Sequence, residues 1–189
     1  MVKVLKVISE PVKVITSFKK INPGRIFGYL LLATLIQTVA LGILGWRFSE
    51  GNSSFLMSLI GYFILGFIAT LFIAYLLKIS VNTLGGSGQY YNGLTALTLG
   101  MIAPAIGFLL FSLLALIPSV GLFLGAIVMA IAIILGITTE LRAIKEMFRV
   151  DMFTAFIGLV IACAGLLLAI YLAMASLTFS NMFAPVLMM

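Results

Sequence analysis

The chain has 189 residues, of which 63% are hydrophobic and 8% are charged, and its mean hydropathy is +1.31. Soluble domains are nearer half apolar and a quarter charged, so this composition excludes a soluble protein and indicates one membrane domain. The net charge of +6 does not indicate nucleic-acid binding, because the basic residues lie beside apolar segments, where they set orientation in a membrane. A single cysteine, Cys163, excludes an intramolecular disulfide and leaves the redox compartment undetermined.

Residues 1–25 predict a short cytoplasmic amphipathic helix at the membrane surface. In "SEPVKVITSFKK", Ser9 is a suitable N-cap and Pro11 is tolerated in the first turn. Apolar residues then recur at helical spacing as far as Phe18, and Lys19 and Lys20 are available to the polar side. Two interpretations stay open for this segment, a topology anchor and a helix that docks a partner.

Five apolar segments follow, and each is long enough to cross a bilayer. They comprise residues 26–46, 55–81, 94–117, 120–139 and 153–179, and a short tail covers 180–189. An all-α bundle is expected, because backbone groups in lipid must be hydrogen-bonded within the segment. Only Pro118 and Ser119 separate the third and fourth segments, which predicts a tight antiparallel pair.

The distribution of basic residues predicts the orientation. With five spans, ten of them fall on one side of the membrane: Lys3, Lys6, Lys13, Lys19, Lys20, Arg25, Lys78, Arg142, Lys145 and Arg149. Arg47 alone falls on the other side. By the positive-inside rule, the N-terminus is cytoplasmic and the C-terminus is extracytoplasmic, and the plasma membrane is the expected location.

A glycine-rich loop joins the second and third spans. It contains Gly85, Gly86 and Gly88, which permit backbone conformations closed to other residues. Tyr90 and Tyr91 suit a membrane–water boundary, and Pro104 is expected to kink the third span. The loop is interpreted either as a structural connector next to a kinked helix or as a binding or gating element.

Polar and small residues within the spans suggest helix contacts. Gln37 is expected to hydrogen-bond to another helix, with a substrate contact as the alternative. Gly121 and Gly125 form a GxxxG pair that permits close helix packing. The segment "ELRAIKEMFRVD" after the fourth span, which includes Arg142 and Arg149, predicts a cytoplasmic helical hairpin, with Asp151 capping the fifth span.

The sequence offers few groups for catalysis or for ion coupling. The five acids, Glu10, Glu50, Glu140, Glu146 and Asp151, are all expected outside the apolar cores. The chain has no histidine for a serine–histidine device, its acids are not spaced as metal ligands, and no phosphate-binding motif is present. We therefore expect no enzymatic activity, no cofactor and no bound metal.

The order of these features resembles the Yip family, the Ypt/Rab-interacting membrane proteins, in its compact prokaryotic form. The likeness covers about residues 8–178 and includes "LLKISVNTLGGSGQYYNGLTALTLGMIAPA" and "ELRAIKEMFRVDMFTAF". It implies a five-span bundle with a cytoplasmic N-terminus and a non-enzymatic role. Eukaryotic relatives act with small prenylated GTPases in vesicle traffic. This chain lacks their long N-terminal domain and the Asp-Leu-Tyr-Gly-Pro type motif, which puts a GTPase partner in doubt.

The expected function is that of a membrane-organising or adaptor protein acting through a basic cytoplasmic face. Its expected partners are anionic lipid headgroups, another membrane protein or a second copy of the chain. The alternative is a small-molecule or lipid transporter, or a permease component, that uses a kinked third span. A transporter should contain a polar-lined cavity that reaches into the membrane, whereas an adaptor should be a dry bundle.

Overall fold

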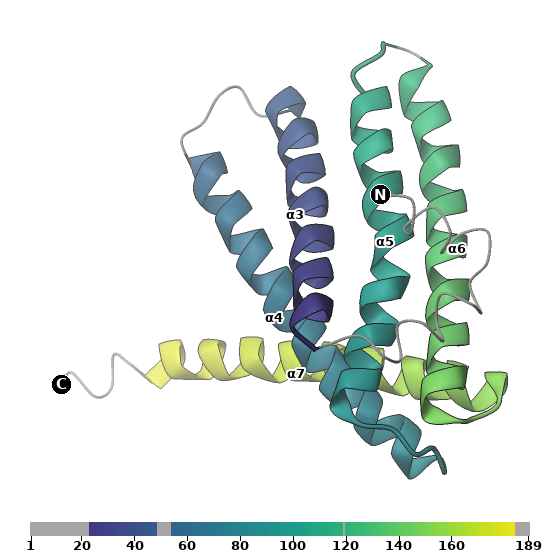
Figure 1. The fold of residues 1–189 in the computed structure, drawn as a ribbon. Helices are drawn as coiled ribbons and strands as arrows, with labels where there is room; N and C mark the ends of the chain where they lie inside the picture. The colour runs from purple at the N-terminus through teal and green to yellow at the C-terminus, as the bar shows by residue number, and fades with distance from the viewer. Residues whose placement is uncertain (1–22, 49–53, 119, 184–189) are drawn as a thin grey trace.

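The computed structural model describes residues 23–48, 54–118 and 120–183, and within these ranges it contains five α-helices and no strand (Figure 1). The helices are α3 (Pro23–Phe48), α4 (Ser54–Thr83), α5 (Tyr90–Leu114), α6 (Gly121–Phe148) and α7 (Met152–Phe183). Each is long and apolar enough to cross a membrane. The predicted all-α, five-span fold class is therefore confirmed, and the chain is an integral multi-pass membrane protein.

The helices α5 and α6 form the predicted antiparallel pair. Gly125, near the start of α6, lies against Phe111 near the end of α5, and Ala132 lies against Gly107, one turn closer to the start of α5. The helix α5 ends at Leu114, three residues before the predicted boundary at 117. The chain leaves the helix there because Ile117 N–H bonds to the Leu114 carbonyl at 2.8 Å, which begins the reversal into α6.

The last helix, α7, runs across the lower ends of the upright helices in Figure 1 and packs against α4. Small residues permit the close approach, because Gly158 lies against Val81 and Gly165 lies against Leu76. The Ser80 hydroxyl lies 2.9 Å from the Gly158 carbonyl oxygen, within donating distance across the two helices. The α4–α7 contact thus combines close packing with a polar link.

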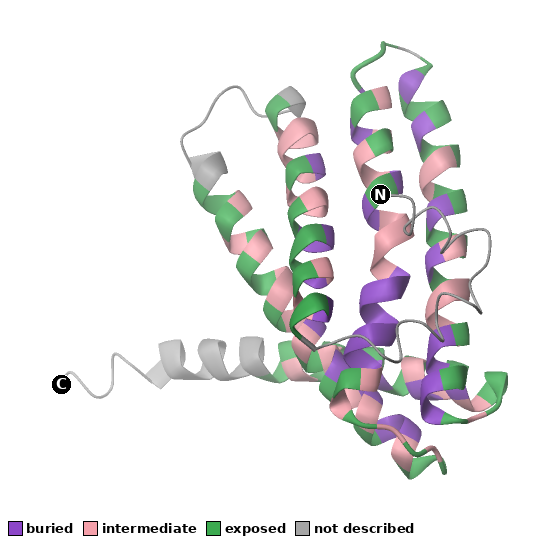
Figure 2. Cartoon of the chain, in the orientation of Figure 1, coloured by how far each residue is buried: buried purple, intermediate pink, exposed green. Residues whose placement is uncertain are grey.

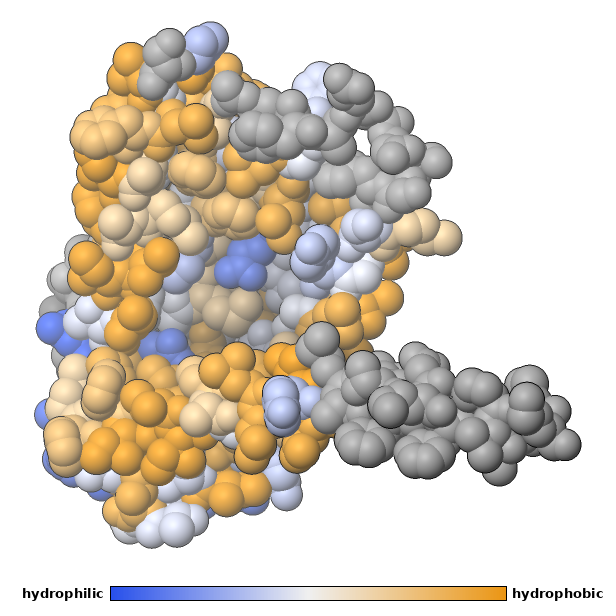
Figure 3. All heavy atoms as spheres, turned by 180° about the vertical axis from the view of Figure 1, so that it is seen from behind, coloured by the Kyte–Doolittle hydropathy of each residue, from blue (hydrophilic) through white to orange (hydrophobic). Residues whose placement is uncertain are grey.

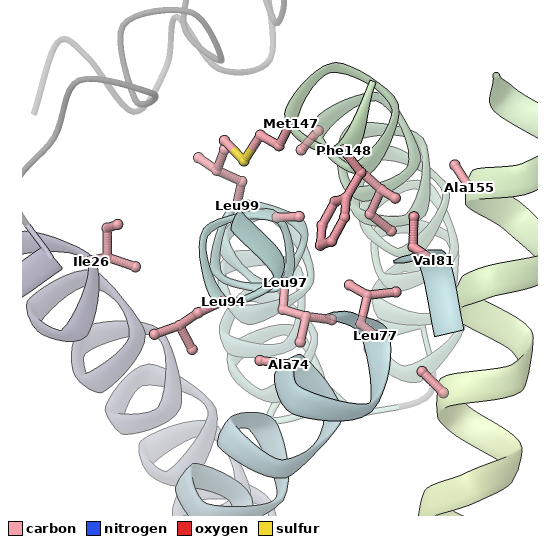
Figure 4. Packing of buried hydrophobic residues seen from close by; sticks show 14 of the residues in the cluster. Ile26, Ala74, Leu77, Val81, Leu94, Leu97, Leu99, Met147, Phe148 and Ala155 are labelled. Atoms are coloured by element: carbon pink, nitrogen blue, oxygen red, sulfur yellow. The ribbon is translucent and has the colours of Figure 1, made fainter. Parts of the chain in front are cut away.

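The hydrophobic core lies at one end of the bundle, where residues of all five helices meet (Figure 4). Ile26 comes from the start of α3, Val81 from the end of α4, Leu94 from the start of α5, Phe148 from the end of α6 and Ala155 from the start of α7. In Figure 2 the buried residues of α5 gather toward the same end. This end is the one that carries the connections α4–α5 and α6–α7.

Outside this core, most of the surface is hydrophobic, as Figure 3 shows for the face seen from behind. Phe123, Phe153 and Tyr171 are each about two-thirds exposed or more. Buried hydroxyl groups bond within their own helices, as Thr98 does to the Leu94 carbonyl at 2.7 Å and Ser112 does to the Phe108 carbonyl at 2.8 Å. An apolar exterior with internally satisfied polar groups is the arrangement that lipid requires.

Candidate functional site

The glycine-rich loop between α4 and α5 is closed by a side-chain amide. Asn82 donates from Nδ2 to the Gly88 carbonyl, and its Oδ1 accepts from the Gly88 N–H, both at 2.9 Å. A backbone bond from Gly86 N–H to the Val81 carbonyl, also 2.9 Å, tightens the same turn. The loop is therefore held by four hydrogen bonds within residues 81–88, the fourth from the Gly85 N–H to the Asn82 carbonyl at 3.2 Å.

The structure explains why glycine occupies each of these three positions in the loop. Gly85 has a φ of +95°, which disfavours any residue with a side chain. A Cβ on Gly86 would come within 3.0 Å of Val81 and Val150, and a Cβ on Gly88 would come within 2.2 Å of the Phe148 ring. These contacts favour the structural-connector interpretation of the loop over a ligand cradle.

The loop is joined to the turn between α6 and α7. Ser87 N–H donates to the Phe148 carbonyl at 2.9 Å, and Asn92 Nδ2 donates to the Met147 carbonyl at 3.2 Å. Arg149 ends α6 in the left-handed conformation, with φ 57°. We call residues 82–89 together with residues 148–151 the connection cluster.

Asp151 begins α7 from within this cluster, which confirms the predicted cap. Its Oδ2 accepts from the N–H groups of Phe153 and Thr154 at 3.0 and 3.2 Å. The hydroxyl of Thr154 also bonds to the Asp151 carboxylate. These bonds, that of the Thr154 hydroxyl first, lower the pKa of Asp151 below its ordinary value, because they favour the charged form.

The two tyrosines after the loop have different surroundings. The Tyr90 hydroxyl donates to the Leu71 carbonyl of α4 at 3.3 Å, so its ring is partly buried and ties α5 to α4. Tyr91 is 43% exposed, and its ring meets that of Tyr90 edge to face at 5.7 Å. Only Tyr91 therefore presents an exposed ring of the kind expected at a membrane boundary.

Pro104 and the GxxxG glycines lie in the α5–α6 contact. The helix α5 continues through Pro104, and a Cβ on Gly136 would come within 2.6 Å of the proline ring. Gly121 and Gly125 face Leu114 and Phe111 in the same way. The GxxxG glycines therefore take part in the contact between α5 and α6 within the chain.

Other predicted residues lie apart from these contacts. Gln37 is partly buried in α3, and within the described ranges its amide makes none of the expected bonds to another helix. Arg142 and Arg149 are exposed near the end of α6. Pro11, Phe18, Lys19 and Lys20, with the predicted amphipathic helix, lie outside the described residues.

The expectation that every acid lies outside the apolar cores is wrong for Glu140. As the predicted helical hairpin requires, α6 continues past residue 139 to Phe148, and Glu140 lies about 12 Å from that end, at 1.5 Å per residue. Its side chain is partly buried and packs on Gly100 of α5, where a Cβ would come within 3.0 Å of Glu140 Oε2. Glycine at position 100 thus leaves room for the carboxylate.

Glu140 lines a cavity of about 700 Å³ between α4, α5, α6 and α7. The rest of the lining is mainly hydrophobic and includes Ile137 and Phe156, with Thr70, Met101 and Cys163 as its other polar or polarisable groups. The Thr70 hydroxyl donates to the Gly66 carbonyl at 2.8 Å. Volumes of 300–1,000 Å³ are typical of small-molecule sites.

A sequence signal for Glu140 exists but is weak. Gly136, Glu140 and Ile144 recur every four residues and so lie on one face of a helix. Gly136 and Ile144 are both buried, which places Glu140 on the packed face. The charges that follow suggested instead that the span ended before it.

Comparisons of the chain with protein-family models, with curated proteins and with solved structures found no match. The fold and the two features above, the connection cluster and the cavity, are therefore the basis for proposing a function.

Proposed function

We propose that the chain is a non-enzymatic membrane-organising or adaptor protein of Yip type that acts through a basic cytoplasmic face. One observation supports this most: all five helices share one core at the end that carries the connection cluster. A rigid end of this kind can present fixed charges to a surface, because its loops are held by hydrogen bonds rather than free to rearrange.

The charges available at this end favour anionic lipid headgroups as the contact. Arg142, Lys145 and Arg149 are exposed at the end of α6, and Arg25 is exposed at the start of α3. Each basic residue near an anionic surface contributes about 1 kcal/mol, less at high salt. In this proposal the N-terminus and both connections are cytoplasmic, the C-terminus is extracytoplasmic, and the membrane is the plasma membrane.

Lipid co-purification tests the proposal. A variant with Arg142, Lys145 and Arg149 all changed to glutamine should fold as the parent does but retain several-fold less anionic phospholipid, measured by mass spectrometry after detergent purification. Arg47→Gln, which removes a cation at the opposite end of α3, is the matched control and should change nothing. Equal retention by the triple variant and the parent would contradict the proposal and would leave a protein partner as the alternative.

A second candidate function, small-molecule or lipid transport, is favoured by the cavity that contains Glu140. An acid within the span is the kind of group that transport commonly uses. Proteoliposomes that take up a solute faster than protein-free liposomes, with the rate lowered by Pro104→Ala, would support transport. Uptake at the protein-free rate would count against it.

A further inference from the structure

We propose that the cavity between α4, α5, α6 and α7 binds a monovalent organic cation with a hydrophobic body, and that the Glu140 carboxylate is its counter-ion. This inference is independent of the adaptor proposal. Transport would be one use of such a site, but binding does not require it.

The first argument is the position of the charge. A carboxylate inside a membrane span is costly unless it is paired or faces a solvated cavity. Within the described ranges, Glu140 has no basic or hydrogen-bonding partner, although its side chain is held in place against Gly100. Either a proton or a cation that enters the cavity from outside can neutralise it, and the proposal concerns the cation.

The second argument is the chemistry of the lining. Apart from Glu140, the cavity wall presents few polar groups, and the Thr70 hydroxyl already donates to the Gly66 carbonyl and faces the Met101 sulfur at 3.7 Å. Among the described residues the lining holds no second acidic side chain, and one carboxylate does not provide the six or more oxygen ligands that a calcium ion takes. It does match one positive charge, and the aliphatic wall matches a hydrophobic body.

The third argument is the presence of an aromatic ring and a polarisable sulfur in the same wall. Phe156 and Met101 both line the cavity. An aromatic face attracts an organic cation. Size also fits, because about 700 Å³ accommodates a ligand of several rings.

Two probes of the same shape and opposite charge test the site, tetraphenylphosphonium and tetraphenylborate. The full-length protein is placed in nanodiscs of zwitterionic lipid, and binding is measured by equilibrium dialysis. After the uptake of each probe by protein-free nanodiscs of the same lipid is subtracted, the cation should bind, and the anion should not. Glu140→Gln should weaken cation binding about tenfold or more, because it removes the charge while keeping the size. Glu140→Asp should bind within a few-fold of the parent.

Glu146→Gln is the matched control, since Glu146 lies on the same helix but does not line the cavity, and it should bind the cation as the parent does. Equal affinity of Glu140→Gln and the parent, or equal binding of the two probes, would overturn the proposal.

A second measurement needs no variant at position 140. Cys163 lines the same cavity and is exposed, so its reaction with a maleimide reports occupancy in the unaltered protein. Tetraphenylphosphonium should slow this reaction several-fold, and tetraphenylborate should leave the rate unchanged. A reaction rate that neither probe alters would overturn the proposal even if Glu140→Gln failed to fold.

Discussion

At the scale of single residues, the connection cluster depends on positions where a side chain would not fit. Gly88 is the clearest case, because its missing Cβ leaves the space that the Phe148 ring fills. Phe148 is fully buried and belongs to the shared core. A change at Gly88 is therefore transmitted from a surface loop to the centre of the packing.

Gly88→Ala should lower the free energy of unfolding by roughly 1–3 kcal/mol, the usual cost of overpacking. The measurement is unfolding in mixed detergent micelles. Ser87→Ala, at the exposed neighbouring position, is the control and should change stability by about 0.5 kcal/mol or less. If both variants were as stable as the parent, the loop would not be packed on Phe148 as described.

Asp151 should make the stability of α7 depend on pH. Its pKa is lowered in the folded state, so its contribution is complete above the unfolded value of about 3.9 and is lost as the pH falls through the folded value. Unfolding of the parent and of Asp151→Asn should be compared from roughly pH 6 to pH 2.5. The stability difference should favour the parent at pH 6 and shrink toward acid. A difference that did not change with pH would show that the carboxylate does not cap α7.

At the scale of helices, the α5–α6 pair depends on close contact along its whole length. A Cβ on Gly136 would lie 2.6 Å from the Gly100 carbonyl oxygen and within 2.6 Å of the Pro104 ring. Two of the three atoms nearest to this Cβ belong to Pro104, so the effects of substitutions at positions 136 and 104 are coupled.

Gly136→Ala should therefore destabilise the protein by roughly 1–3 kcal/mol, although alanine is the better helix former by about 1 kcal/mol. Adding Pro104→Ala should recover part of the loss. Gly28→Ala is the control, because Gly28 lies in a helix with open space around it and should be neutral or slightly stabilising. The pairing would be refuted if Gly136→Ala matched the control in thermal unfolding.

The helices themselves were predictable from hydropathy, but the contacts of their polar residues were not. Long uncharged runs identify each span, and the short connection at Pro118 predicts the α5–α6 pair. The charged segment after residue 139 was predicted to be helical, and α6 does continue to Phe148, but its charges did not indicate that Glu140 packs against Gly100 of α5. The role of Asn82 in closing the loop was also missed, since it depends on where Gly88 returns in space.

At the scale of the whole molecule, the distribution of burial is uneven. The shared core lies at the end with the connection cluster, while much of the remaining helix surface is exposed and hydrophobic. Hydropathy cannot locate such a core, because in lipid both the buried and the outward faces of a helix are apolar. The cavity could not be located from the sequence either, because it forms only where four helices meet around Glu140.

The proposed orientation places the end with the shared core on the cytoplasmic side of the membrane. Side-specific labelling with a membrane-impermeant maleimide tests it most directly, in a Cys163→Ala background. Ser87→Cys lies in the connection cluster, and Ile117→Cys lies in the exposed turn between α5 and α6. Ser87→Cys should be labelled only from the cytoplasmic side and Ile117→Cys only from the outer side. Labelling of Ser87→Cys from outside intact cells, or labelling of both positions from one side, would contradict it.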